Sequence, residues 1–206
     1  MRKLSWYTRA CALFAALATA AVLLPAQTFK TLDSFDDADG AAPWATLVQG
    51  SDGSFFGTTQ KGGNTACALG CGTIFQITPS GTLTMFSFDG TNGSDPYAGL
   101  LQAAHGDFYG VTSTGGASNG GGRCANNCGT VFKIAPGGKL TTLHNFDWTD
   151  GAIPTGTPIQ AADGNFYGTT QIGGAVGSGS IFKITSSGSI SSTSSELYGT
   201  ISKSSA

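Results

Sequence analysis

The chain has 206 residues, which allows one compact domain or a short array of repeats and excludes two large domains. Charged residues make up 11% of it, glycine contributes 32 residues, and the only glutamate is Glu196. Helical bundles and coiled coils need many Glu, Lys and Arg residues, so this composition excludes both and favours β-structure. A formal net charge of −2 at pH 7 also argues against nucleic-acid binding, because phosphate backbones attract basic surfaces.

Residues 1–26 have the parts of a secretory signal peptide. Arg2, Lys3 and Arg9 supply positive charge, and an uncharged apolar run of 15 residues follows from residue 10 to residue 24. Because a membrane-spanning helix needs about 20 residues, we expect cleavage after Ala26, with an uncleaved anchor as the alternative. The protein is therefore expected to be exported to the cell surface, the extracellular space or the periplasm, with no membrane span after cleavage. The mature chain would carry 7 basic and 12 acidic residues, a formal charge of −5.

Three copies of one sequence unit fill the chain after the signal. Phe35, Phe88 and Phe146 begin equivalent stretches of 29 positions that align without a gap. A loop of variable length follows each stretch, at residues 64–71, 117–128 and 175–178. The copies then realign as GTIFQITPSGTL, GTVFKIAPGGKL and GSIFKITSSGSI. Self-similarity at a period near 55 is typical of repeat architectures such as solenoids and propellers.

Each copy predicts four short antiparallel strands. In the second copy these occupy residues 99–104, 107–113, 131–135 and 139–145. The first two strands are joined at His105-Gly106, where the other copies have Asp-Gly, and we expect a type I′ turn there. Such a sheet has two apolar faces and can cover both only by stacking between neighbours, as propeller blades do. The predicted fold is all-β: an antiparallel, propeller-like array of about three four-stranded blades, complete or incomplete.

The segments and their expected roles are as follows. Residues 1–26 form the signal peptide, residues 27–190 the repeat domain with copies at about 35–87, 88–145 and 146–190, and residues 191–206 a Ser-rich disordered tail. Residues 28–35 align with the fourth strand of a copy, and we expect them to replace the weak last strand at 190–193. Closed propellers normally have at least four blades. The array is therefore a truncated one, an open arc, or a protomer completed by homo-oligomerisation.

The repeats resemble those of the choice-of-anchor tandem repeat GloVer-containing proteins. The motifs that carry the resemblance are FYGVTSTGG at 108–116, FYGTTQIGG at 166–174 and GTVFKIAPGGKLTTL at 129–143. The resemblance covers about residues 28–190. It implies an exported, propeller-like repeat protein without an established activity.

Four cysteines lie in pairs in the variable loops of the first two copies, and we interpret them as two local disulfides, Cys67 with Cys71 and Cys124 with Cys128. A zinc site and free thiols are the alternatives. Neighbouring blades would hold the two pairs farther apart than four zinc ligands at about 2.3 Å allow. An exported chain also favours disulfides, and each would stiffen a glycine-rich loop.

An acidic turn opens each copy. It contains, in chain order, Asp36 and Asp39, Asp89 and Asn92, and Asp147 and Asp150. Oxygen-bearing side chains beside a tight glycine turn are how calcium loops are built, so calcium binding is one hypothesis. The alternative, which we favour, is a turn in which the first Asp accepts hydrogen bonds from backbone amides. No metal or other cofactor is expected.

Aromatic residues suggest a sugar-binding surface. In each copy two adjacent aromatic residues of one strand must face opposite sides, and we expect one of each pair in the core. The other could join Trp44, Tyr97 or Trp148 in a surface on which sugars stack, but core packing between blades is the interpretation that we favour.

Catalytic patterns are weak. His105 and His144 occupy positions where other copies have Asp, and we find no Ser-His-Asp or zinc-hydrolase spacing. The function we expect is therefore non-enzymatic: an exported binding or structural module for a polysaccharide or a surface protein. The alternative is a carbohydrate-active hydrolase or lyase, for which Asp95 and Asp107 are the nearest acidic pair.

Overall fold

The computed structural model describes residues 28–191. The predicted signal peptide, residues 1–26, and residues 192–206 of the predicted Ser-rich tail lie outside the described residues. Residues 28–31 belong to a separate N-terminal unit and contain no regular element. The repeats lie in the second unit, which begins at Leu32.

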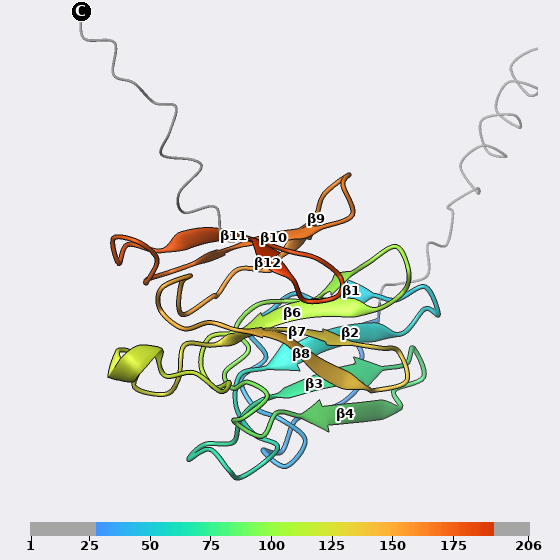
Figure 1. Cartoon of the computed structure of the whole chain (residues 1–206). Helices are drawn as coiled ribbons and strands as arrows, with labels where there is room; N and C mark the ends of the chain where they lie inside the picture. The colour runs from blue at the N-terminus through green and yellow to red at the C-terminus, as the bar shows by residue number, and fades with distance from the viewer. Residues whose placement is uncertain (1–27, 192–206) are drawn as a thin grey trace, which may run out of the picture. The chain divides into compact units, whose positions relative to one another are not determined.

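Three four-stranded antiparallel sheets make up this unit, one from each sequence copy (Figure 1). The first sheet contains β1 (Val48–Gln49), β2 (Phe55–Thr59), β3 (Thr73–Ile77) and β4 (Leu83–Ser87). The second contains β5 (Leu101–Gln102), β6 (Phe108–Thr112), β7 (Thr130–Ile134) and β8 (Leu140–Asn145). The third contains β9 (Ile159–Gln160), β10 (Phe166–Thr170), β11 (Ser180–Ile184) and β12 (Ile190–Ser191). Strands that follow one another in sequence pair in every sheet.

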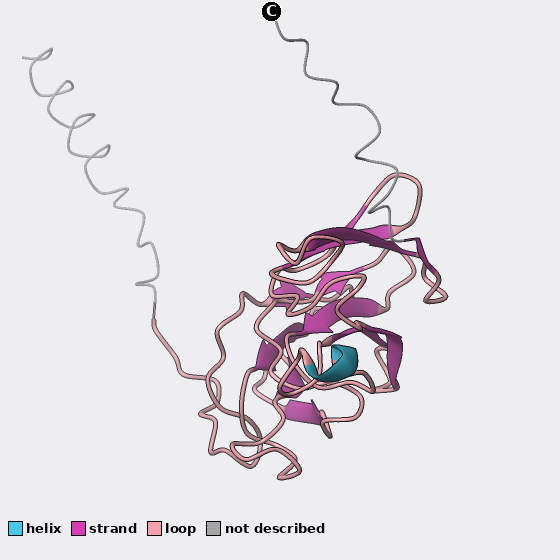
Figure 2. Ribbon diagram, turned by 60° about the vertical axis from the view of Figure 1, so that its left-hand side comes forward, coloured by secondary structure: helices cyan, strands magenta, loops and turns pink. Residues whose placement is uncertain are grey.

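The predicted fold class is confirmed: the described chain is all-β and propeller-like. Its only helical element within residues 28–191 is one turn of 3-10 helix at Gly120–Gly122, in the variable loop of the second copy (Figure 2). The second sheet lies between the first and the third (Figure 1). Each of its faces therefore packs against a neighbouring sheet.

The turn between the first two strands of each sheet differs from the prediction. Gly53 donates to the carbonyl of Gly50, and Gly50 donates to the carbonyl of Ser54, which defines a three-residue loop. Positive φ occurs at Gly53 (82°) but not at Asp52, whereas a type I′ turn requires it at both central residues. The type I′ prediction was therefore wrong. The loop is a turn followed by a glycine in the left-handed region, and Gly106 and Gly164 serve the same purpose in the other sheets.

The N-terminal segment is also not as predicted. Residues 28–35 form no strand, and the fourth strand of the third sheet is β12, which pairs with β11. Phe35 instead packs edge-on against Phe75, with ring centroids 5.1 Å apart. Within the described residues, Ile190 pairs with Ile184 and Ser191 with Lys183. The chain's own β12 therefore already occupies the fourth-strand position for which the N-terminal segment was predicted.

Aromatic stacking joins the sheets. Phe108 of β6 stacks on Phe56 of the first sheet with ring centroids 4.0 Å apart, and Tyr109 stacks on Phe166 of the third sheet at 3.8 Å. Phe108 and Tyr109 are adjacent on one strand and therefore face opposite sides. Both are almost completely buried, at 1% and 0% exposure, so both residues of this pair lie in the core rather than one. Core packing between blades, the interpretation favoured for the paired aromatic residues, is what the structure shows in the middle sheet.

Candidate functional site

A cavity of about 600 Å³ lies between the variable loops of the first and second copies. The first loop contributes residues 66–70, and the second contributes residues 125–127. The polar side chains between them are those of Lys61, Thr91, Ser94, Asp95 and Thr114. The third variable loop, 175–178, does not line this cavity. A second hollow, of about 480 Å³, also borders the first loop and shares Lys61.

Disulfides fix both of the loops that line the cavity. Cys67 is bonded to Cys71, and Cys124 to Cys128, with sulfur atoms 2.05 Å and 2.01 Å apart. The prediction of two local disulfides is therefore confirmed. Cys71 and Cys128 have no exposed surface, so each bridge attaches its loop to the core of a sheet-to-sheet interface. A loop attached in this way has few conformations and can present its side chains in a constant geometry.

Backbone contacts connect each disulfide loop to the next copy. The amide of Asp95 donates to the carbonyl of Cys71 at 3.1 Å, and the amide of Ile153 donates to that of Cys128 at 2.9 Å. Both donors have positive φ, as does Ala42 at the same position of the first copy. Such a conformation is uncommon outside glycine and is tolerated best by Asn and Asp. Each of the three residues directly precedes a Pro, so this backbone conformation is a feature of the repeat.

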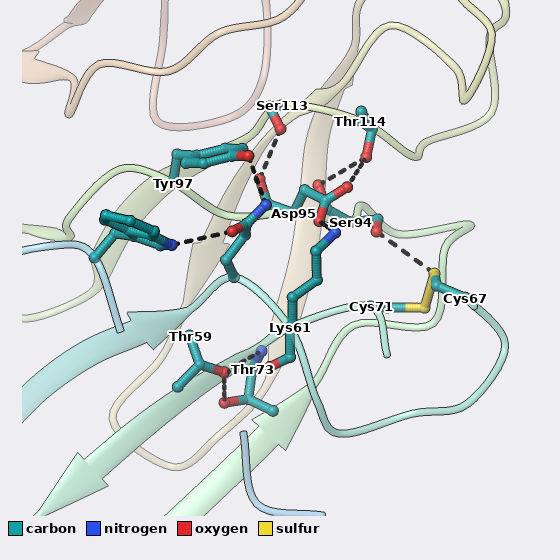
Figure 3. A network of polar contacts seen from close by, with 12 residues as sticks. Thr59, Lys61, Cys67, Cys71, Thr73, Ser94, Asp95, Tyr97, Ser113 and Thr114 are labelled. Carbon is teal, nitrogen blue, oxygen red and sulfur yellow. Dashed lines mark hydrogen bonds and ion pairs between the residues drawn. A yellow bond between two sulfur atoms is a disulfide. The ribbon is translucent and has the colours of Figure 1, made fainter. Parts of the chain in front are cut away.

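An ion pair between Lys61 and Asp95 belongs to the cavity wall. Figure 3 shows this pair within a network of polar contacts. The other carboxylate oxygen of Asp95 accepts a hydrogen bond from Thr114 Oγ1 at 2.9 Å. The side chains of Lys61 and Asp95 are 29% and 17% exposed, so the pair is shielded but still reaches solvent. The paired charges leave this wall polar and close to electrically neutral.

Two aromatic residues lie beside this ion pair. Gln60 joins them: its Oε1 accepts from Trp44 Nε1 at 3.1 Å, and its Nε2 donates to the hydroxyl of Tyr97 at 2.6 Å. Trp44 is 70% exposed and Tyr97 is 42% exposed. The structure thus brings together two of the three aromatic residues proposed for sugar binding. It places the third, Trp148, elsewhere, on the opening turn of the third copy with the guanidinium of Arg123 5.7 Å from its ring centroid.

The acidic turns are closed by their own backbone. Asp36 Oδ1 accepts from the amides of Ala38 and Asp39, and Asp39 Oδ1 accepts from the amide of Asp36. The pairs Asp89 with Asn92 and Asp147 with Asp150 repeat this pattern. This is the turn chemistry that we favoured over calcium binding. The six residues of the calcium hypothesis lie in three separate turns, and residues 28–191 contain no cluster of three or more His, Cys, Asp or Glu suited to a metal ion.

The turn at Asp147 leads to a pH prediction. The hydrogen bond from Thr149 Oγ1, together with those from the amides of Thr149 and Asp150, lowers the pKa of Asp147 below its ordinary value of 3.8. A carboxylate with a lowered pKa stabilises the folded state above its unfolded pKa, and this contribution disappears as the pH falls. We expect Thr149→Val to lower the urea midpoint at pH 7, with a difference from wild type that shrinks below about pH 4. Thr155→Val, an exposed threonine of the same copy, is the control and should show no such pH dependence.

The candidate catalytic groups do not converge. Asp95 contacts residues that follow β6, whereas Asp107 precedes β6 and contacts Lys133 at 3.9 Å and His105 at 3.6 Å. A strand of five residues spans about 17 Å, and the carboxyl groups of glycosidases lie about 5–9.5 Å apart. Asp95 and Asp107 therefore do not form such a pair. His144 is hydrogen-bonded to Asp150 at 2.6 Å, within the acidic turn of the third copy.

Lys61 and Asn126 are cavity residues that the sequence did not single out. Lys61 stands where the other copies have Thr114 and Ile172, and Asn126 lies in a loop whose length differs between copies. The signal that could have identified Lys61 is its departure from the repeat, together with that of Asp95. The two residues are 34 positions apart, however, and only the packing of two copies shows that they are paired.

No helix within residues 28–191 is long and apolar enough to cross a membrane. Comparison with curated proteins gives no match.

Two solved structures are similar to parts of this chain. One, an X-ray structure assigned as a gluconolactonase, is 15% identical with a TM-score of 0.41 and covers 70% of this chain and 44% of its own. The other, a luciferin-regenerating enzyme, is 14% identical with a TM-score of 0.42 and covers 68% of this chain and 41% of its own. This chain therefore spans less than half the length of either protein.

The family comparison agrees with the repeats found in the sequence. The model described as the Gloeobacter/Verrucomicrobia repeat matches residues 19–123, just over half of the chain. That range contains the first two copies up to the variable loop of the second. The chain therefore belongs to the Gloeobacter/Verrucomicrobia repeat family.

Proposed function

We propose that this protein is an exported, non-enzymatic binding module that takes a polysaccharide into the cavity between its first two variable loops. The observation that carries the proposal is the combination of that cavity with an exposed aromatic pair beside it. The cavity holds about 600 Å³, within the usual range for small-ligand sites. Trp44 and Tyr97 are both hydrogen-bonded to Gln60, the residue before Lys61 of the cavity wall.

The chemistry of the lining favours a neutral, hydroxyl-rich ligand. The amide of Asn126 can both donate and accept hydrogen bonds. The hydroxyls of Thr91 and Thr114 donate to Asp89 and Asp95, so their oxygens can still accept. The charge of Lys61 is balanced by Asp95, so the wall has no excess positive charge with which to attract a phosphate or a sulfate. Sugar rings have polar edges that form hydrogen bonds and apolar faces that pack on aromatic side chains. The cavity wall offers the polar groups, and Trp44 and Tyr97, which lie outside that lining, offer the aromatic faces.

Export is supported by the disulfides. Disulfides persist in oxidising compartments and are rare in the cytosol, and two occur in this chain. The signal-like sequence of residues 1–26 points the same way. A surface or extracellular protein would meet polysaccharides in either location.

Binding to a panel of soluble polysaccharides by isothermal titration calorimetry tests this function. We expect Trp44→Ala to weaken binding about 2- to 10-fold, as loss of one stacking contact does, and Asn126→Ala to weaken it similarly. Val176→Ala is the matched control, because Val176 is 73% exposed on the third variable loop and lines neither cavity. Its affinity should equal that of wild type.

Two results would reject the proposal. The first is the absence of binding to every polymer of the panel. The second is an equal loss of affinity in all three variants, which would place the ligand elsewhere. An assay for new reducing ends on the same polymers separates binding from hydrolysis, and turnover would contradict the non-enzymatic part of the proposal.

A further inference from the structure

The two interfaces between sheets are built from the same repeat positions. At the first interface Phe56 and Ile74 of the first sheet are 4% and 0% exposed. At the second interface their counterparts in the second sheet, Tyr109 and Val131, are both 0% exposed. The first and second sheets therefore each have one face that is covered by the sheet of the next copy. We call this face the forward face. In the third sheet it is formed by Ile159, Tyr167, Thr169 and Ile181.

The forward face of the third sheet is exposed. Ile181 is 60% exposed, although its counterparts Ile74 and Val131 are fully buried. Ile159 is 63% exposed, and Thr169 is exposed where Thr58 is 2% exposed. This face keeps the composition of an interface and has no neighbouring sheet within residues 32–191.

The opposite end of the array has the matching surface. The rear face, as we call it, is formed in the first sheet by Leu47 and Phe55. Leu47 is 54% exposed, whereas its counterpart Leu100 is 5% exposed at the first interface. Phe55 is half-buried, whereas its counterpart Phe108 is 1% exposed and stacks on Phe56. At the first interface, Leu100 and Phe108 of the second sheet help to cover the forward face of the first sheet. The rear face of the first sheet has the equivalent side chains, Leu47 and Phe55.

The tyrosine of the exposed forward face is hydrogen-bonded at the same hairpin position as its buried counterpart. At the second interface Tyr109 stacks on Phe166 while its hydroxyl lies 3.1 Å from His105 Nε2, at the end of the hairpin. The hydroxyl of Tyr167 donates in the same way to Asp163, at 2.8 Å, from the equivalent hairpin position. A Phe55 ring from another copy would thus meet a ring held as Tyr109 is held.

Polar groups also match across the two end faces. At the first interface the buried hydroxyl of Thr58 donates to the carbonyl of Ala98 at 2.9 Å. Thr169 and Ala45 are the counterparts of these residues on the forward and rear faces. They would form the same hydrogen bond if the two faces met. The register of the contact is therefore set by hydrogen bonding as well as by apolar packing.

We infer that two copies of this chain associate head to tail, the forward face of each covering the rear face of the other. The contact would continue the two interfaces already present, with the same residues at the same repeat positions. A heterologous contact of this kind either closes into a ring or grows without limit. The described residues of two copies supply six sheets, within the range of about four to eight blades in closed propellers, whereas those of three copies would exceed it. A closed dimer is therefore the expected assembly.

Sedimentation equilibrium of the purified protein tests this inference. We expect a species of twice the chain mass that does not grow further as the concentration rises. Ile181→Asp on the forward face and Leu47→Asp on the rear face should each weaken dimerisation by about 100-fold or more, because each buries an unpaired charge. Both residues are largely exposed within one chain, so the monomers should keep the wild-type circular dichroism spectrum. Val176→Asp, at an exposed loop residue, is the matched control and should remain dimeric.

Mixing the two variants separates a head-to-tail contact from a symmetric one. A dimer of one Ile181→Asp chain and one Leu47→Asp chain has one intact interface, so the mixture should form dimers although neither variant does alone. A wild-type protein that is monomeric at all concentrations would overturn the inference. Open-ended growth would also overturn it. So would an Ile181→Asp or Leu47→Asp variant that dimerises as wild type does, or a mixture of the two that stays monomeric.

Discussion

Gly129→Ala is expected to lower the free energy of unfolding by more than about 3 kcal/mol, which is enough to unfold a domain of ordinary stability in part. Gly129 has φ of 95°, a conformation that strains any other residue. A Cβ atom there would also lie 2.3 Å from the carbonyl oxygen of Thr112 and 2.9 Å from Pro154 Cδ. The oxygen belongs to the last residue of β6, so the backbone would have to move to relieve the overlap.

The other copies place the same demand on this position. Cβ atoms at Gly72 and Gly179 would lie 2.6 Å and 2.4 Å from the carbonyl oxygens of Thr59 and Thr170. In every copy, the glycine that follows the variable loop thus lies close to the carbonyl group at the end of the second strand. This close approach is part of the repeat.

Urea unfolding followed by tryptophan fluorescence measures the effect of Gly129→Ala. The control is Gly122→Ala, because Gly122 has φ of 88° but a Cβ there would meet nothing within 4 Å. That variant should lose only the conformational part, about 1 kcal/mol. Equal losses in the two variants would mean that φ, rather than the close approach, requires glycine at residue 129.

Phe108→Ala should cost about 3–5 kcal/mol, the usual loss for a buried phenylalanine. Phe108 is 1% exposed, stacks on Phe56 at 4.0 Å and belongs to the apolar cluster that joins the first two sheets. Removing its ring leaves a cavity between two sheets that are each held on their own by backbone hydrogen bonds, so the surroundings cannot easily collapse into it.

Phe55→Ala is the comparison for Phe108→Ala, because Phe55 occupies the same repeat position in the first sheet but is half-buried. We expect a loss of no more than about 2 kcal/mol there, in proportion to the smaller area removed from water. Both variants should be made with Ile181→Asp, so that association of chains does not add to the measured stability. A loss at residue 55 equal to that at residue 108 would contradict the stacking of sheets as the main source of stability.

The alignment of three copies predicted the strands well, because the determinants of a strand and its turns lie within a few residues. Apolar alternation and recurring glycines identified the strands of every sheet, and glycine at the hairpin ends marked the turns. The turn type was wrong because Asp-Gly fits two loops: a two-residue turn, and a three-residue turn whose last residue alone has positive φ. The hydrogen bonds between Gly50, Gly53 and Ser54 distinguish them.

The candidate site was predicted only in part. The two disulfides were predicted correctly, because each joins residues four positions apart within one loop. The aromatic prediction named Trp44, Tyr97 and Trp148 together because they lie near the start of each copy. Gln60 joins only the first two, and Trp148 has a different neighbour, Arg123. Proximity in the repeat did not mean proximity of side chains, since the three residues do not occupy one aligned position.

By itself, the sequence determined the repeat, the four antiparallel strands per copy, the closed acidic turns and the two loop disulfides. All of these depend on residues close together in the chain, where spacing dictates geometry. Only the tertiary structure decided that Lys61 meets Asp95, that two variable loops share one cavity, and that the two ends of the array expose matching faces. These features join different copies. They follow from how side chains interdigitate when sheets pack at close range, which the order of residues along one copy does not specify.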